Sequence, residues 1–160
     1  MTLELVQQKR EPVLRPDTRQ NKDREQELEQ AEAIPVRLPP VRVRTERQEV
    51  AAFLRETGGY QKRGCVPLTF PLRWLALPVV RDLIAKSISS GFLPLHEAQN
   101  FAYERELLLD TEYILGVEAR QTPSPPRLTL RTSVTSPQGD ICARLETVLR
   151  IVPAASKPAQ

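Results

Sequence analysis

Few residues of this chain are suited to acid–base chemistry, because histidine occurs only once. His96 is that residue, Glu97 follows it directly, and Asp110 is the next aspartate along the chain. An imidazole beside a carboxylate can move protons near neutral pH. These three residues are therefore the candidate catalytic groups, although a histidine beginning a strand next to Glu97 and Gln99 is more often held structurally by hydrogen bonds.

The two cysteines, Cys65 and Cys142, are far apart and have no His or Cys neighbours at ligand spacing. This pattern favours neither a zinc site nor a disulfide framework, and it indicates reduced thiols inside the cell. Cys65 has no base close to it in the sequence, so packing explains it better than nucleophilic catalysis. We expect neither a metal nor a cofactor.

The composition describes one globular domain. Of 160 residues, 40% are hydrophobic, and 23 basic against 20 acidic residues leave a net charge of +3. This small excess does not predict a nucleic-acid partner. No apolar run is long enough for a membrane span, and the N-terminus, with Glu4 and Glu11 among basic residues, resembles no signal peptide. A cytoplasmic protein is the default expectation.

Three segments differ in composition. Residues 1–33 are dominated by charged residues and glutamine, which predicts a disordered tail, and residues 154–160 form a second tail. The folding domain is expected at 34–153. Within it, the prolines of 34–43 predict extended chain with an edge strand near 41–44.

Two helices are predicted next. Thr45 and Gln48 have capping-box spacing, an apolar face follows at Val50, Phe53 and Leu54, and Gly58 with Gly59 ends the first helix. The second helix, over residues 72–84, is apolar enough to be covered on most sides, and Pro78 should kink or restart it.

From residue 93 onward, apolar residues alternate with polar ones. This period of two recurs over 101–103, 113–119, 128–134 and 141–151, with turns at 122–126 and 137–139. The pattern predicts at least four meandering antiparallel strands and therefore an α+β fold. The sheet has one apolar face, and it can bury this face together with the long apolar helix by wrapping around that helix. This is the hot-dog arrangement. Its open sheet edge predicts dimerisation.

Several motifs resemble those of the MaoC-like acyl-thioester hydratases and dehydratases. LHEAQNFAYER (95–105) is similar to their His-Gly-Glu-Gln-x-Phe-x-Tyr-x-Arg stretch, VAAFLRETG (50–58) to a helix ending in Ala-Thr-Gly-Asp, and VPLTF (66–70) to Pro-Pro-Thr-Phe. Residues 107–113 and the strand LETVLRIV (145–152) also fit. The segment 106–111 departs from the family's Pro-Leu-x-x-Gly-Asp, so Asp110 stands either for that Asp or for the preceding Gly.

The resemblance implies a catalytic Asp with a His five residues later, and this chain has neither. Gly59 and Gly64 occupy those positions. The implied role is the non-catalytic or substrate-shaping half of an enoyl-thioester hydratase or 3-hydroxyacyl-thioester dehydratase. It would form a homodimer or pair with a catalytic hot-dog subunit, with acyl-CoA or an acyl-carrier thioester as ligand. The candidate substrate-binding residues are Thr69, Phe70, Trp74, His96 and Gln99.

Two alternatives remain open. A divergent hydratase or thioesterase would use His96 with Glu97 or Asp110. A non-enzymatic assembly protein would instead recruit a partner through the charged tail, and a pull-down with residues 1–33 deleted would test that recruitment.

Overall fold

The computed structural model describes residues 34–154. The predicted tail at 1–33, and the predicted C-terminal tail apart from residue 154, lie outside these residues. The elements are β1 (Val36–Arg37), β2 (Val41–Arg44), α2 (Arg47–Thr57), the 3₁₀ helix η1 (Phe70–Ala76), α3 (Pro78–Lys86), β3 (Phe92–Tyr103), β4 (Glu112–Pro123), β5 (Pro126–Thr135) and β6 (Ile141–Pro153). No helix among them is long and apolar enough to cross a membrane.

The strands form one antiparallel sheet in the order β1-β4-β5-β6-β3, with β2 also paired to β4. Hairpins join β4 to β5 and β5 to β6, as the turn signals predicted. The prediction of a four-strand meander is wrong at β3, which pairs with β6 rather than with β4. The segment after β3 turns away instead and bonds to the chain beside α2, where the Asp110 N–H donates to the Thr45 carbonyl at 2.7 Å.

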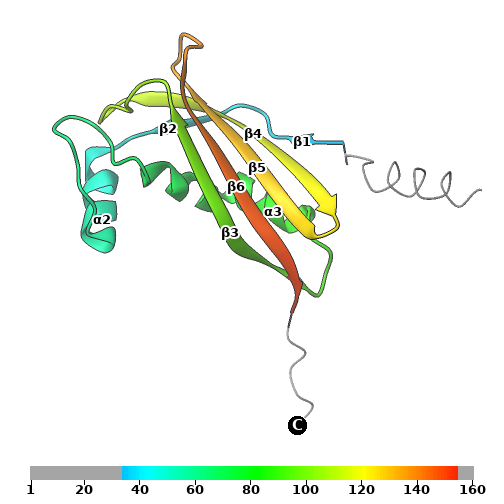
Figure 1. Cartoon of the computed structure of the whole chain (residues 1–160). Coiled ribbons are helices and arrows are strands. Elements are labelled where there is room, and N and C mark those ends of the chain that lie inside the picture. Colours follow the sequence, from blue (N-terminus) through cyan, green and yellow to red (C-terminus); the bar gives the residue numbers. More distant parts are fainter. Residues whose placement is uncertain (1–33, 155–160) are drawn as a thin grey trace, which may run out of the picture. The chain divides into compact units, whose positions relative to one another are not determined.

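The sheet curves around η1 and α3, which lie against one of its faces (Figure 1). The strands alternate because one face is buried there and the other meets solvent. This inner face follows the predicted period of two and packs on the helices through a set of buried residues: Tyr113, Leu115, Val117, Ala119, Leu128, Leu130, Val134, Ala143, Leu145 and Leu149.

The first helix begins later than its capping signal predicted. The N-cap of α2 is Glu46, and it makes no side-chain cap hydrogen bond. The Thr45 hydroxyl is fully buried and donates instead to the Leu108 carbonyl at 2.6 Å. The predicted stop is confirmed, since Gly58 adopts a left-handed conformation (φ 64°) and its N–H bonds to the Leu54 carbonyl.

The predicted long apolar helix is divided into η1 and α3. Leu77 is extended (ψ 137°) between them, and Pro78 opens α3. A proline disfavours helical backbone at the residue before it, so the helix restarts rather than bends. Its predicted coverage on most sides is wrong for the single chain, because Val79 remains exposed while Val80 and Leu83 are buried.

Candidate functional site: an apolar pocket beside His96

A pocket of about 380 Å³ lies between the two short helices and the inner face of the sheet. Its only ionisable side chain belongs to His96 of β3, and its only other polar side chain belongs to Thr147 of β6. The remaining lining comes from η1, α3, β3, β5 and β6: Leu72, Leu75, Ile84, Pro94, Leu130 and Leu149. The arrangement suits an apolar ligand that carries one polar group.

A β-bulge separates His96 from its neighbour Glu97. His96 pairs with Leu149 and Ala98 with Val148, so Glu97 is the extra residue. While His96 lines the pocket, the Glu97 carboxylate accepts hydrogen bonds from two arginines on β5 and β6.

These bonds come from Arg127 Nε at 2.6 Å, Arg127 Nη2 at 2.8 Å and Arg150 Nη2 at 2.8 Å. Hydrogen bonds from Arg127, and then from Arg150, lower the pKa of Glu97 to about 2. The structure therefore pairs this carboxylate with arginines rather than with His96.

Gln99 of β3 is not part of the pocket lining, but it contacts the lining residue Thr147. The buried Thr147 hydroxyl donates to Gln99 Oε1 at 2.7 Å. Within residues 34–154, the His96 imidazole makes no hydrogen bond or ion pair, so it is available to a ligand. The alternation along residues 141–151 places Thr147 on the same buried face as its apolar neighbours. Thr147 was not predicted as a site residue because that pattern was read from apolar side chains alone.

Asp110, the third candidate, caps α2. Its carboxylate accepts the Arg47 backbone N–H at 3.0 Å and the Arg47 guanidinium at 2.9 Å. These bonds to Arg47, the backbone bond first, lower the pKa of Asp110. Its φ of 54° lies in the left-handed region, which glycine adopts most easily and which aspartate also tolerates.

Four of the five substrate-binding candidates, Gln99 among them, lie outside the pocket lining. Phe70 and Trp74 are buried in the core, where Phe70 meets Phe53 and Trp74 edge to face at 5.5 and 6.0 Å. Thr69 is exposed just before η1. Core packing accounts for both aromatic residues without a ligand.

The loop between α2 and η1 contains Gly59 and Gly64, which stand where the resemblance implies the catalytic Asp and His. Gly64 is left-handed (φ 79°), and its carbonyl accepts the Leu109 N–H. Next to it, the Cys65 thiol donates to Glu106 Oε2 at 3.3 Å, and Lys62 binds the same carboxylate at 2.9 Å. Burial and then the bond to Glu106 raise the pKa of the Cys65 thiol, which disfavours the nucleophilic thiolate.

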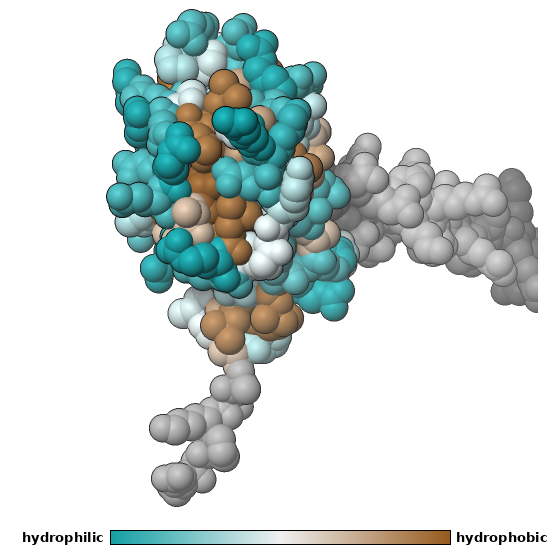
Figure 2. Space-filling view, turned by 90° about the vertical axis from the view of Figure 1, so that its left-hand side faces the viewer, coloured by the Kyte–Doolittle hydropathy of each residue, from teal (hydrophilic) through white to brown (hydrophobic). Residues whose placement is uncertain are grey.

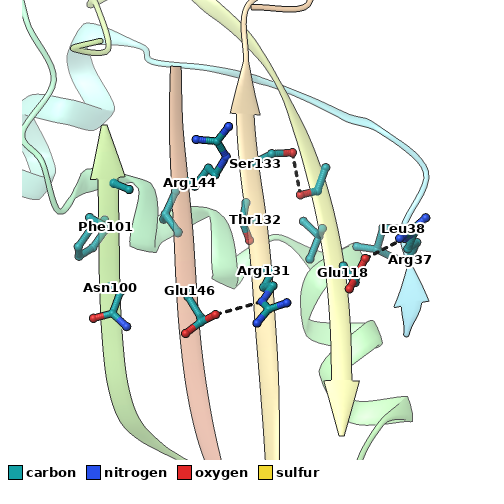
Figure 3. Close-up of a pocket in the computed structure, with 14 residues that line it drawn as sticks. Arg37, Leu38, Asn100, Phe101, Glu118, Arg131, Thr132, Ser133, Arg144 and Glu146 are labelled. Atoms are coloured by element: carbon teal, nitrogen blue, oxygen red, sulfur yellow. Dashed lines mark hydrogen bonds and ion pairs between the residues drawn. The ribbon is translucent and has the colours of Figure 1, made fainter. Parts of the chain in front are cut away.

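A larger hollow of about 680 Å³ lies across the strands and includes outward side chains of the sheet (Figure 3). Ser133 and Gly116 form part of it, and a Cβ at Gly116 would lie 2.7 Å from Ser133 Oγ. Its charges are paired within the chain, as in the bond from Arg131 to Glu146 at 3.0 Å and that from Arg37 to Glu118 at 2.8 Å. We therefore place the candidate site at the smaller, apolar pocket.

Apolar side chains are also exposed around the open edge of the sheet. Figure 2 shows them as a stripe and as a second patch near the point where the chain leaves β6. The exposed fractions are 42% for Phe92 and 51% for both Leu93 and Leu95, all on β3. Leu93 and Leu95 lie on the same face of β3, opposite to that of Phe92, and exposed apolar side chains along an edge strand are typical of an interaction surface.

No family model matches the chain, and no curated protein sequence matches it. Solved structures do share its fold, and the class that they define is the hot-dog fold.

The (R)-hydratase of A. caviae involved in PHA biosynthesis superposes with a TM-score of 0.57 and 17% identity, covering 76% of this chain and 98% of that one. The 3R-hydroxyacyl-ACP dehydratase complex HadBC of Mycobacterium tuberculosis superposes with a TM-score of 0.55 and 17% sequence identity. The match covers 72% of this chain and 94% of that one. A thioesterase superfamily member from Thermus thermophilus superposes with a TM-score of 0.54 and 12% sequence identity. The match covers 77% of this chain and 85% of that one. The predicted α+β hot-dog fold is thus confirmed.

Proposed function

We propose that this chain is the non-catalytic, substrate-shaping subunit of an enoyl-thioester hydratase or 3-hydroxyacyl-thioester dehydratase. The observation that carries the proposal is an apolar pocket whose one histidine lacks a carboxylate partner within residues 34–154. Adding or removing water next to a thioester requires both an acid and a base at fixed positions. No acid–base pair lines this pocket, so under this proposal the acid and the base come from a second chain.

The open edge of β3 supports such a partnership. β3 is the last strand of the sheet, and its outer side presents unpaired backbone groups together with Leu93 and Leu95. A long, exposed, apolar edge strand pairs readily with another strand. The 3R-hydroxyacyl-ACP dehydratase among the similar structures is itself a complex named for two components.

The ligand proposed for the pocket is an acyl thioester of coenzyme A or of an acyl carrier. The leucines and Ile84 would hold its acyl chain, while His96 Nδ1 or Nε2 would face the polar thioester end. The reaction that we propose for the assembly requires neither a metal nor a redox cofactor, since only a water molecule and protons move.

The decisive experiment is native mass spectrometry of the protein from its own cells, with a crotonyl-thioester hydration assay on each assembly. We expect activity only in a heteromer that contains a second hot-dog chain. An active homodimer would overturn the non-catalytic assignment.

One observation favours a second candidate, a divergent hydratase or thioesterase. His96 lines the pocket and is free to act on a ligand there, so the chain would then be active alone. In that case His96→Ala would abolish turnover by the isolated chain. The matched variant Gln99→Ala, which removes the partner of Thr147, would lower turnover less.

A further inference from the structure

β3 forms one margin of the sheet, and among residues 34–154 only β6 pairs with it (Figure 1). In an antiparallel pair, alternate residues turn their N–H and C=O toward the neighbouring strand, and the residues between them turn both groups away. The residues of β3 that face away from β6 therefore decide where a further strand can form hydrogen bonds with this margin.

A hydrogen bond just before β3 shows which residues of its first half face away from β6. The Ala154 N–H donates to the Gly91 carbonyl at 2.7 Å, so residues 91 and 154 face each other across the pair. Alternation along the register then turns every second residue from 92 onward toward the open margin. These residues are Phe92, Pro94 and His96.

This first half is poorly suited to pairing with another strand. Proline has no N–H, so Pro94 presents only a carbonyl to the margin. The Phe92 N–H donates at 3.3 Å to the Ser89 carbonyl of the turn before the strand. That leaves His96 as the outward donor of this half, and the β-bulge follows it at once. A regular ladder of hydrogen bonds therefore cannot run along the first half.

After the bulge, the alternation is shifted by one residue. The Glu104 N–H donates to the Cys142 carbonyl at 2.9 Å, so residue 104 and every second residue before it face β6. Three others face the margin, and each carries both an N–H and a C=O: Gln99, Phe101 and Tyr103. Residues 99–103 span about 17 Å at about 3.3 Å per residue, and they offer a regular ladder to a second strand.

The side chains of β3 divide at the same place. In the first half both faces are exposed, with Leu93 and Leu95 on one face and Phe92 on the other. In the second half, Phe101 and Tyr103 are half-buried and stack on each other with their ring centroids 6.5 Å apart. The first half thus suits contact through apolar side chains, and the second half suits pairing through the backbone.

We infer that a second hot-dog chain forms hydrogen bonds with β3 only over residues 99–103, and that it covers residues 92–95 through side chains alone. This inference rests on the proposed function, because it takes the partner from there and assigns the part of β3 that this partner pairs with. A lone extended peptide paired over 99–103 would leave Leu93 and Leu95 in water, whereas a folded chain has the surface to cover them. Proline and a bulge on an edge strand also restrict which strands can pair with it, so they make the contact selective.

The test is hydrogen exchange at single-residue resolution on the assembly isolated from the protein's own cells. We expect the N–H groups of Gln99, Phe101 and Tyr103 to exchange at least about a hundredfold more slowly than that of His96, because only the former are bonded to the partner strand. Equally fast exchange at all four residues would show that no strand pairs here. Equally slow exchange would show that the ladder continues past the bulge.

Removal of a single backbone N–H provides a second test. Replacement of Phe101 by phenyllactate keeps the side chain and puts an ester oxygen in place of the N–H. Loss of one hydrogen bond to the partner should weaken association about fivefold, measured by analytical ultracentrifugation with the partner chain. The same replacement at Phe92 is the matched control, because the N–H of Phe92 bonds to Ser89 within its own chain and association should not change.

The outcomes separate the inference from the proposed function. If the assembly forms but neither ester weakens it, or both weaken it equally, the restriction to residues 99–103 is wrong and the proposed function stands. If the assembly is an active homodimer, the proposed function fails, and the exchange rates still decide where β3 is paired. If the protein is isolated from its cells as a single chain, both fail.

Discussion

At the bulge in β3, the neighbouring residues His96 and Glu97 lie on opposite faces of the sheet. His96 lines the apolar pocket, whereas Glu97 is held by Arg127 and Arg150. Adjacent side chains alternate between the two faces of any regular strand. The bulge adds one residue, Glu97, between His96 and Ala98, which pair with the consecutive β6 residues Leu149 and Val148. The two residues that looked like one acid–base pair in sequence therefore have separate roles.

Replacement of Glu97 by glutamine should lower the melting temperature at pH 7 by a few degrees, because two arginines lose a charged partner. The folded-state pKa of Glu97 is about 2, below its ordinary value of 4.5. The carboxylate's contribution is thus fully present above pH 4.5 and is lost as the pH falls through about 2. Thermal melts of both proteins at several pH values should show the difference shrinking over that interval.

The control for this substitution is Glu104→Gln. Glu104 also pairs with an arginine, Arg144, at 2.7 Å, but both side chains are more than half exposed. Exposed ion pairs contribute little to stability, so its melting temperature should hardly change. An equal loss in the two variants at all pH values would contradict the role assigned to Glu97.

Thr45→Val tests the buried hydroxyl that connects the start of α2 to the segment after β3. Valine keeps the shape of the fully buried Thr45 side chain but leaves the Leu108 carbonyl and the Thr111 N–H without this partner. The free energy of unfolding should fall by about 1–3 kcal/mol, measured by urea denaturation. Thr135→Val is the control, since Thr135 is half-buried and makes one longer bond of 3.2 Å, and a loss as large there would contradict the argument.

The helices illustrate which local signals persist in the folded chain. Pro78 restarts the chain as α3, and this was one of two outcomes that the sequence left open. The Gly58 stop also survives, because a left-handed residue ends a helix wherever the helix lies. The Thr45 cap did not survive, because a tertiary partner, the Leu108 carbonyl, binds its hydroxyl.

Gly58→Ala should destabilise the end of α2 by about 1–2 kcal/mol, since an alanine there must adopt the positive φ of 64°. Space is not the cause, because a Cβ at Gly58 would meet nothing within 4 Å. Gly59→Ala is the matched control. Gly59 has no positive φ, and its added Cβ would make ordinary contacts, so we expect only a small change in urea denaturation. Equal losses would rule out the backbone explanation.

At the scale of the whole molecule, β3 is an edge strand that pairs only with β6 among the strands of residues 34–154. Leu95→Arg should prevent a second chain from pairing with this edge, because it places a charge where apolar surface would be buried. Analytical ultracentrifugation should then show the variant as a monomer, and we expect the unaltered protein to sediment as a dimer or heteromer.

Leu108→Arg controls for the general effect of an added surface charge. Leu108 is 52% exposed, almost the same as Leu95 at 51%, but it belongs to the segment between β3 and β4, where it pairs with Cys65. We expect this variant to keep its partner. Dissociation in both variants, or in neither, would show that β3 is not the interface.

The repeating patterns of the sequence located most strands of this protein and the first helix, but not the division of the second helix. Alternation along residues 113–119 and 128–134 placed buried side chains correctly because it follows from the pleat of a strand, which is a local property. The same patterns predicted an α+β chain with a sheet wrapped around one long apolar helix, which the structure divides into η1 and α3. The absence of the catalytic Asp and His was inferred by comparing residues with the family that the chain resembles.

The pairing of β3 with β6 and the composition of the pocket depended on contacts between distant segments. A hydrophobic period shows which face of a strand is buried, but it does not say which strand lies beside it. For the same reason, Thr147 and Leu130 could not be assigned to the His96 pocket, nor Arg127 to Glu97, until the chain had folded. A hydrogen bond or a shared cavity depends on where two residues lie in space. The spacing of residues along the chain does not predict which distant residues will meet.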